Sequence, residues 1–116
     1  MNRTSEPQRG EIWTVDLDPT RGHEQSGKRP ALVVSASLFN QGPSGLVIVL
    51  PLTMRDKRIP THIRVAPPEG GLPAVSFIKC EDIRSVSTER LTRRWGVVSE
   101  TTLTQVEDAM RILLEL

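Results

Sequence analysis

The sequence has few of the residues that support metal binding, disulfide bonds or aromatic stacking. Its 116 residues include one cysteine, two histidines and no tyrosine, and 3% of them are aromatic. A single cysteine excludes an intramolecular disulfide and a cysteine-based zinc cluster, as expected in a reducing cytoplasm. Two separate histidines lack the spacing of metal ligands. We therefore predict that the protein uses no metal ion and no cofactor, and that Cys80 is a core thiol.

Long apolar runs and internal repeats are also missing. No stretch of 18 apolar residues could cross a membrane, and residues 1–8 are polar, without the apolar region of a signal peptide. We expect a soluble, cytoplasmic protein that makes no membrane contact. The length and a hydrophobic content of 37% fit one modest core. The predicted organisation is a disordered N-terminal extension over residues 1–8 and a single domain over residues 9–116.

The chain as a whole lacks a strong charge excess. Fifteen basic and 14 acidic side chains give a formal net charge of +1, so any contact with nucleic acid must depend on a local basic surface. Segment 53–64 is such a region, with Arg55, Lys57, Arg58 and Arg64 against Asp56. Segment 100–116 is acidic instead.

Hydrophobic patterning predicts a small domain made mainly of β-strands, the signature of a barrel or a sandwich. Glycine and proline separate strand patterns near residues 11–17, 30–36, 46–52, 61–66, 74–80, 83–86 and 91–98. The apolar run 46–50 predicts a strand buried on both faces, and Pro51 indicates an edge or a bulge near its end.

Only the last segment is predicted to be helical. Ser99 is the expected N-cap, and apolar residues follow at helical spacing, which predicts a stripe that closes the core. This stripe consists of Leu103, Val106, Met110, Leu113 and Leu114.

A long polar segment, residues 16–30, joins the first two strand patterns. Segments of this length without a hydrophobic pattern are commonly functional or disordered. The strand patterns on either side indicate that both ends are anchored. Its charged side chains can hold a phosphate and move a proton, and they are Arg21, His23, Glu24, Lys28 and Arg29.

Several short motifs occur in a fixed order along the chain. They are Arg9-Gly10-Glu11-Ile12-Trp13, Asp16-Leu17-Asp18-Pro19, Gly22-His23-Glu24-Gln25, Gly27-Lys28-Arg29-Pro30-Ala31-Leu32-Val33-Val34 and Pro51-Leu52-Thr53. Through these motifs the sequence resembles the MazF/PemK family of toxin endoribonucleases, from about residue 9 to the C-terminus. The resemblance implies an SH3-like barrel of the plasmid-maintenance toxin type with one C-terminal helix. It also implies a homodimer and an acidic antitoxin partner with a disordered tail.

The activity implied by the resemblance is metal-independent, sequence-selective cleavage of single-stranded RNA by attack of a 2'-OH. The family's two catalytic positions fall on Arg29 and Thr53. The planar fork of Arg29 can bind two phosphate oxygens, and because a guanidinium stays protonated we expect it to stabilise charge rather than move a proton. Glu24 could be the general base if partial burial raised its pKa. Its alternative role is to hold Arg29 in place.

Further residues are predicted to contact the RNA: His23, Gln25, Lys28, Arg55 and Glu81. Glu81 lies where some relatives have the Asp of an Arg-Cys-Asp triplet, but both charged positions of that triplet differ here. His62 is expected to be a surface residue of a strand rather than a catalyst. Trp95 is expected in the core, with stacking on a base as the alternative.

Two other functions are consistent with the same fold class. A toxin that inhibits DNA gyrase by protein contact would carry an aromatic-glycine pair at the extreme C-terminus, whereas Trp95-Gly96 is internal. A noncatalytic SH3-like binding module would need an aromatic groove, which four scattered aromatic residues hardly supply.

Overall fold

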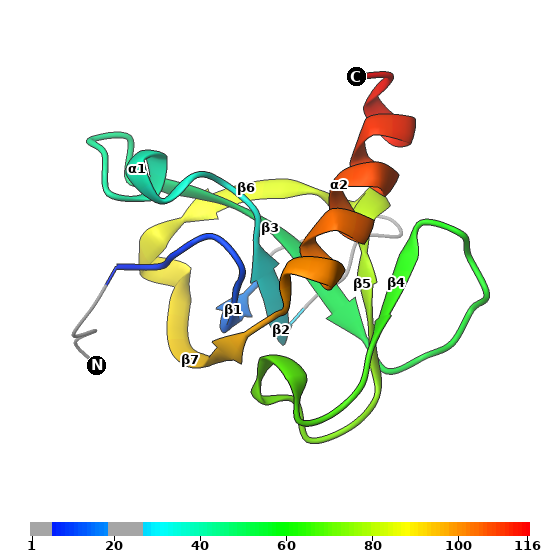
Figure 1. Ribbon diagram of the computed structural model, residues 1–116. Helices are drawn as coiled ribbons and strands as arrows, with labels where there is room; N and C mark the ends of the chain where they lie inside the picture. The colour runs from blue at the N-terminus through cyan, green and yellow to red at the C-terminus, as the bar shows by residue number, and fades with distance from the viewer. Residues whose placement is uncertain (1–5, 19–26) are drawn as a thin grey trace.

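The protein is built around an antiparallel β-sheet. The computed structural model describes residues 6–18 and 27–116, in which seven strands form a sheet of order β4-β5-β3-β2-β1-β7, with β6 paired to β3 (Figure 1). The predicted class, mainly β with a C-terminal helix, is confirmed. The described strands leave the sheet open, because its terminal strands β4 and β7 do not pair with each other. The strands are β1 (Glu11–Asp16), β2 (Lys28–Val33), β3 (Leu46–Thr53), β4 (His62–Val65), β5 (Ser76–Lys79), β6 (Arg84–Ser87) and β7 (Leu91–Val97).

The described chain contains more helical structure than the sequence pattern predicts. Beside α2 (Glu100–Leu114) there is a short helix α1 (Ser37–Asn40), and there are three 3₁₀ turns, η1 (Glu69–Gly71), η2 (Cys80–Asp82) and η3 (Thr88–Arg90). The prediction of a single helical segment was wrong because elements of three or four residues are too short to show a helical period. None of the described helices is long and apolar enough to span a membrane.

Strand β3 lies inside the sheet and changes partner along its length. It pairs with β2 on one side; on the other it pairs with β6 as far as Val49 and with β5 from Leu52 onward. Pro51, which has no backbone N–H, falls between these two ladders, so a central strand can accommodate it. Of the two predicted alternatives, an edge or a bulge, the edge was wrong, and the irregularity at Pro51 is this change of partner. The burial predicted for residues 46–50 holds for Val47, Val49 and Leu50, but Leu46 is 39% exposed.

Alternate residues of β1, β2 and β3 face two separate apolar clusters, as the two-residue period of a strand requires. One cluster contains Ile12, Leu32 and Leu52 together with Val106 of α2. The other contains Val15, Ala31, Val33 and Val49, among others. Both faces of these central strands are therefore packed.

Helix α2 begins as predicted and covers the first cluster. The hydroxyl of Ser99 accepts a hydrogen bond from the Thr102 backbone N–H at 3.2 Å, which confirms the N-cap. Leu103 and Met110 pack against the cluster. Leu113 and Leu114 are 38% and 50% exposed, because the C-terminal end of α2 projects beyond the strands (Figure 1). The predicted stripe therefore closes the core only as far as Met110.

The described part of the predicted N-terminal extension packs against the domain. Pro7 is buried, and its carbonyl accepts a hydrogen bond from Asn40 Nδ2 at 3.1 Å. The backbone N–H of Gln8 donates to Glu11 Oε1 at 2.8 Å. Residues 1–5 lie outside the described residues.

Turn η1 is held between β7 and the start of α2. A Cβ on Gly71 would lie 2.1 Å from the Trp95 carbonyl oxygen, and a Cβ on Gly96 would lie 2.6 Å from the Gly70 carbonyl carbon. The Glu69 carboxylate accepts hydrogen bonds from the Ser99 backbone N–H at 3.0 Å and from the Thr102 hydroxyl at 2.5 Å. These contacts fix the chain that follows η1.

Two glycines with the same backbone conformation allow a matched test of this close packing. Gly71 (φ +71°) and Gly45 (φ +69°) are both left-handed, but no atom would lie within 4 Å of a Cβ on Gly45. Gly45→Ala should therefore lower the free energy of unfolding only by the strain of a left-handed alanine, about 1 to 2 kcal/mol. Gly71→Ala adds an overlap with backbone and should cost at least about 3 kcal/mol. Urea unfolding measures both, and equal losses would contradict the proposed role of the contact.

The Glu69 carboxylate should make stability depend on acidic pH. Burial raises its pKa, but hydrogen bonds from Thr102 and Ser99 outweigh burial and leave the pKa below its ordinary value of 4.5. The ionised Glu69 carboxylate therefore adds to the free energy of unfolding. This stabilisation is complete above pH 4.5 and is lost as the pH falls through the lowered pKa of the folded state.

Glu69→Gln should cost about 1 kcal/mol at pH 7. The gap in free energy of unfolding between the variant and the wild type should close as the pH falls below 4.5, because the wild-type carboxylate is then protonated. Urea unfolding at a series of pH values measures the gap, with Glu89→Gln, an exposed carboxylate, as the control. A gap that widens in acid would refute the role of the carboxylate.

Candidate active site

The two predicted catalytic residues lie on neighbouring strands in matching positions. The β2–β3 ladder pairs Ala31 with Pro51 and Leu32 with Leu50. The same register continued to the end of both strands places Arg29 opposite Thr53. Opposite residues of an antiparallel pair share a face of the sheet and have their Cβ atoms about 5 Å apart. The structure therefore brings Arg29 and Thr53 together, although 23 residues separate them in the sequence.

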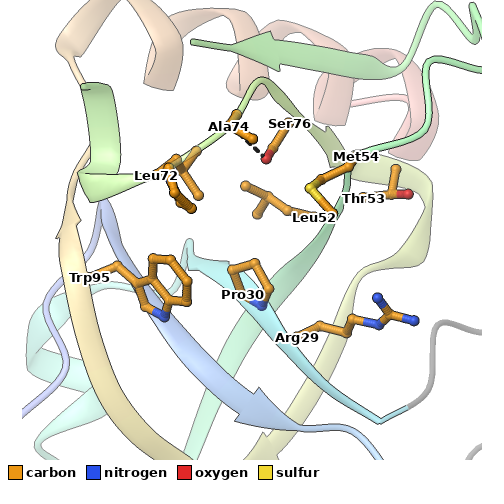
Figure 2. Close-up of a pocket in the computed structure, with 10 residues that line it drawn as sticks. Arg29, Pro30, Leu52, Thr53, Met54, Leu72, Ala74, Ser76 and Trp95 are labelled. Carbon is orange, nitrogen blue, oxygen red and sulfur yellow. Dashed lines mark hydrogen bonds between the residues drawn. The ribbon is translucent and has the colours of Figure 1, made fainter. Parts of the chain in front are cut away.

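Arg29 and Thr53 stand at the rim of a pocket of about 190 Å³. Pro30, Leu52 and Trp95 are among the residues that form its apolar interior. Figure 2 shows the guanidinium of Arg29 and the hydroxyl of Thr53 on one side, pointing away from Trp95. Strand alternation explains this division, because Pro30 and Leu52 face the core while their neighbours face the opposite side.

The hydroxyl of Thr53 is oriented by the chain that follows it. Thr53 Oγ1 accepts a hydrogen bond from the Arg55 backbone N–H at 3.2 Å. A threonine hydroxyl has one donor and two acceptor positions, so its hydrogen remains available for another oxygen. The side chains of Arg55 and Lys28 are exposed, and each lies within two residues of the predicted catalytic pair in the chain. Their predicted contact with RNA remains a prediction.

The two ends of the polar segment 16–30 are fixed beside each other. The Leu17 N–H donates to the Gly27 carbonyl at 3.0 Å, and the Gly27 N–H donates to Asp18 Oδ1 at 2.9 Å. Arg90 donates to the backbone carbonyls of Asp16 and Asp18. Both ends are therefore anchored as predicted. His23, Glu24 and Gln25 lie outside the described residues, and their roles stay predictions.

Glu81 belongs to a different group of side chains. Its carboxylate lies 2.6 Å from His62 Nε2 and accepts a hydrogen bond from the Thr61 hydroxyl at 2.9 Å. Burial raises the pKa of Glu81, but hydrogen bonds, the largest from His62, outweigh burial and lower the pKa. Glu81 is not among the residues that line the pocket with Arg29 and Thr53, so nothing in this geometry supports its predicted contact with RNA.

The surface position predicted for His62 was wrong. Its side chain is 2% exposed because Glu81 follows β5 and closes over it. Strand periodicity gave no sign of this pairing, since the partner comes from a turn. The neighbouring Cys80 is buried as predicted, and burial raises the pKa of its thiol to about 12. This thiol is therefore protonated at neutral pH and is a poor nucleophile.

Trp95 packs against the core, as predicted. It also lines the pocket, which was not predicted. Its indole N–H donates to Thr14 Oγ1 at 2.6 Å, and the ring is half-buried. The Arg93 guanidinium carbon lies 5.0 Å from the ring centroid, within range of a cation–π interaction. Arg93 and Trp95 are two residues apart on a strand, and this spacing was the available sign of a shared face.

Within residues 6–18 and 27–116, no three His, Cys, Asp or Glu side chains come together in a way that could hold a metal ion. The chemistry that the described site can supply is that of hydrogen-bond donors and fixed positive charge. Such groups stabilise negative charge that develops on an oxygen.

Fold and site together define a small β-sheet protein that presents an arginine and a threonine on paired strand ends beside an apolar pocket. A sequence profile for the PemK-like, MazF-like toxin of type II toxin-antitoxin systems matches residues 8–114. The chain belongs to this toxin family, as its motifs indicated.

Individual relatives agree with this assignment. Endoribonuclease MazF9 of Mycobacterium tuberculosis is 39% identical in an alignment of 113 residues that covers 93% of this chain and 96% of the relative. The crystal structure of MazF from Deinococcus radiodurans superposes with a TM-score of 0.87 at 26% identity, covering 97% of this chain and 99% of that one. A MazE-MazF crystal structure from the same organism gives a TM-score of 0.78 at 28% identity, covering 97% and 98%.

Proposed function

We propose that the protein is the toxin of a toxin–antitoxin pair and an endoribonuclease that cleaves single-stranded RNA without a metal ion. The observation that carries the proposal is the cross-strand pair of Arg29 and Thr53 at the pocket rim. The similar MazF9 protein is named an endoribonuclease, which supports the same class of reaction. The gyrase alternative has no comparable support, because Trp95-Gly96 lies within β7.

In the proposed reaction the 2'-oxygen of one ribose attacks the adjacent phosphorus, and the bond from phosphorus to the 5'-oxygen of the next nucleotide breaks. The 2'-OH loses its proton to a base, and the departing 5'-oxygen gains a proton. The products are a 2',3'-cyclic phosphate and a 5'-hydroxyl. The protein must hold the phosphate in line and stabilise its developing charge.

Arg29 and Thr53 suit these two tasks. The Arg29 guanidinium can donate two parallel hydrogen bonds to phosphate oxygens, and the Thr53 hydroxyl, already oriented by Arg55, can donate a third. Glu24 remains our candidate for the base that accepts the 2'-OH proton. Basic side chains beside the rim, among them Lys28 and Arg55, would hold the flanking RNA.

The substrate is proposed to be single-stranded because a small sheet surface can contact base edges only when the bases are splayed out. His23 and Gln25 are candidate contacts within the polar segment. We place the reaction in the cytoplasm, where mRNA is available. Which RNA sequence is selected depends on contacts that form in the complex.

We further propose a homodimer and an acidic antitoxin with a disordered tail. The similar MazE-MazF crystal structure from Deinococcus radiodurans supports a partner of this kind. A symmetric dimer would cover apolar surface that is exposed in one protomer. A tail rich in Asp and Glu could bind to the basic segment 53–64.

The reaction can be tested with purified protein and a long RNA in excess EDTA. We expect cleavage to continue, and the downstream product to carry a 5'-hydroxyl that polynucleotide kinase labels without prior phosphatase treatment. Strict dependence on Mg²⁺, or 5'-phosphate ends, would refute the mechanism. Equal cleavage of a duplex of the same sequence would refute the preference for single strands.

Arg29→Lys tests the bidentate phosphate contact. The variant keeps the charge but loses the planar fork, so kcat should fall at least about 100-fold, the usual effect of losing an oxyanion donor. An exposed ion pair would contribute only about 0 to 1 kcal/mol, and its loss would leave cleavage nearly unchanged.

Thr53→Val is the matched variant on the opposite strand. It keeps the shape of the side chain and removes the hydroxyl, and should slow cleavage with little change in thermal unfolding. A folded Arg29→Lys protein that cleaves RNA at the wild-type rate would exclude a catalytic role for Arg29.

A further inference from the structure

The strand register places one more basic residue in line with the catalytic pair. The β3–β5 ladder pairs Thr53 with Phe77, and the β4–β5 ladder pairs Phe77 with Arg64. Since Arg29 lies opposite Thr53 on the other side, a single row crosses four adjacent strands from Arg29 through Thr53 and Phe77 to Arg64. With adjacent strands about 4.8 Å apart, Arg64 lies roughly 10 Å from Thr53 and roughly 14 Å from Arg29 along this row.

Cross-strand partners share a face of the sheet, so the register assigns Arg64 to the side that carries Arg29 and Thr53. Because β4 is a terminal strand, Arg64 also lines the groove at this edge of the sheet, between β4 and α2. Phe77, between them, is 8% exposed and acts as a buried spacer. Arg64 is exposed and lies on β4, a terminal strand of the sheet. The row therefore has an exposed arginine at each end, Arg29 on β2 and Arg64 on β4.

The surroundings of Arg64 do not give it a structural role. It makes no ion pair with the described residues. Asp108, which lines the same groove between β4 and α2, forms its ion pair with Arg111 at 3.0 Å. By contrast, the half-buried Arg84 on β6 is bound by Asp82 at 2.8 Å. Arg64 therefore resembles a binding residue more than a stabilising one.

We propose that Arg64 binds a phosphate of the RNA on one side of the cleavage site, one or two nucleotides from the phosphate held by Arg29 and Thr53. The proposal rests on the proposed function and adds a direction for the RNA across the sheet, from β2 toward β4. Charge supports it, because the loop from Thr53 to β4 carries three further exposed basic residues. These are Arg55, Lys57 and Arg58.

Binding is measured with an RNA that contains the cleavage site and has a 2'-deoxyribose at the scissile nucleotide, which removes the attacking hydroxyl. Arg64→Gln should raise Kd several-fold. It should also make the slope of log K against log salt shallower by about 0.7, the value for one phosphate contact on a single strand. Arg64→Lys should restore most of the affinity and most of the salt slope. Arg9→Gln, which removes one positive charge from a groove that Arg64 does not line, is the control and should match the wild type.

The phosphate can then be located by replacing single phosphates of this RNA with neutral methylphosphonates. At one position beside the cleavage site, the replacement should weaken binding to the wild type and leave binding to Arg64→Gln unchanged. With cleavable RNA, Arg64→Gln should raise KM and leave kcat within about twofold, since the residue lies roughly 10 Å from Thr53.

The outcomes separate the two proposals. A wild-type protein that cleaves RNA, together with an Arg64→Gln variant equal to it in Kd and salt slope, would refute the phosphate contact alone. The phosphate contact would also be refuted if every methylphosphonate replacement weakened RNA binding to the Arg64→Gln variant as much as it weakened binding to the wild type. A wild-type protein that neither binds nor cleaves RNA would refute the proposed function itself.

Discussion

The register of the β2–β3 ladder is the constraint on which both the fold and the site depend. Alternate residues of these strands face two different apolar clusters, so a slip of one residue would exchange the contents of both faces. Leu32 and Leu52 would leave one cluster, and Arg29 and Thr53 would turn toward the pocket interior. Because both faces are packed, such a slip would lose apolar burial on each side. The packing of the core thus fixes which residues stand at the rim.

A second constraint shapes the pocket from the opposite side. The backbone of η1 lies so close to β7 that Gly71 and Gly96 have no room for a Cβ, and Glu69 ties the same turn to the start of α2. Residues directly after η1 therefore stand beside Trp95, whose ring is held by Thr14. The pocket wall is built from turns and strand ends that are fixed by the same packing as the core. A rigid wall of this kind would hold the side chains at the pocket rim in fixed positions.

The features that could be predicted from the sequence are those that depend on local pattern. The strands follow two-residue alternation, the N-cap Ser99 precedes a helical stripe, and the motifs around Arg29 and Thr53 identified the family. The errors share a cause, which is contact between distant segments. Pro51 is tolerated in a central strand because β6 and β5 leave a gap there, and His62 is buried by a turn that follows β5. No periodicity within one strand could reveal either arrangement, or the row that links Arg64 to Thr53.

A nearly neutral chain can still present a basic surface if its acidic groups are used internally. Glu11 binds the indole N–H of Trp13 and the guanidinium of Arg94, and Glu69 binds the backbone N–H of Ser99 at the start of α2. Asp82 binds Arg84 on β6. These carboxylates serve the fold and lie outside the segment 53–64, where exposed basic residues outnumber the single Asp56. Net charge is therefore a poor guide to the local surface charge of this protein, which depends on which charged side chains the fold has already paired.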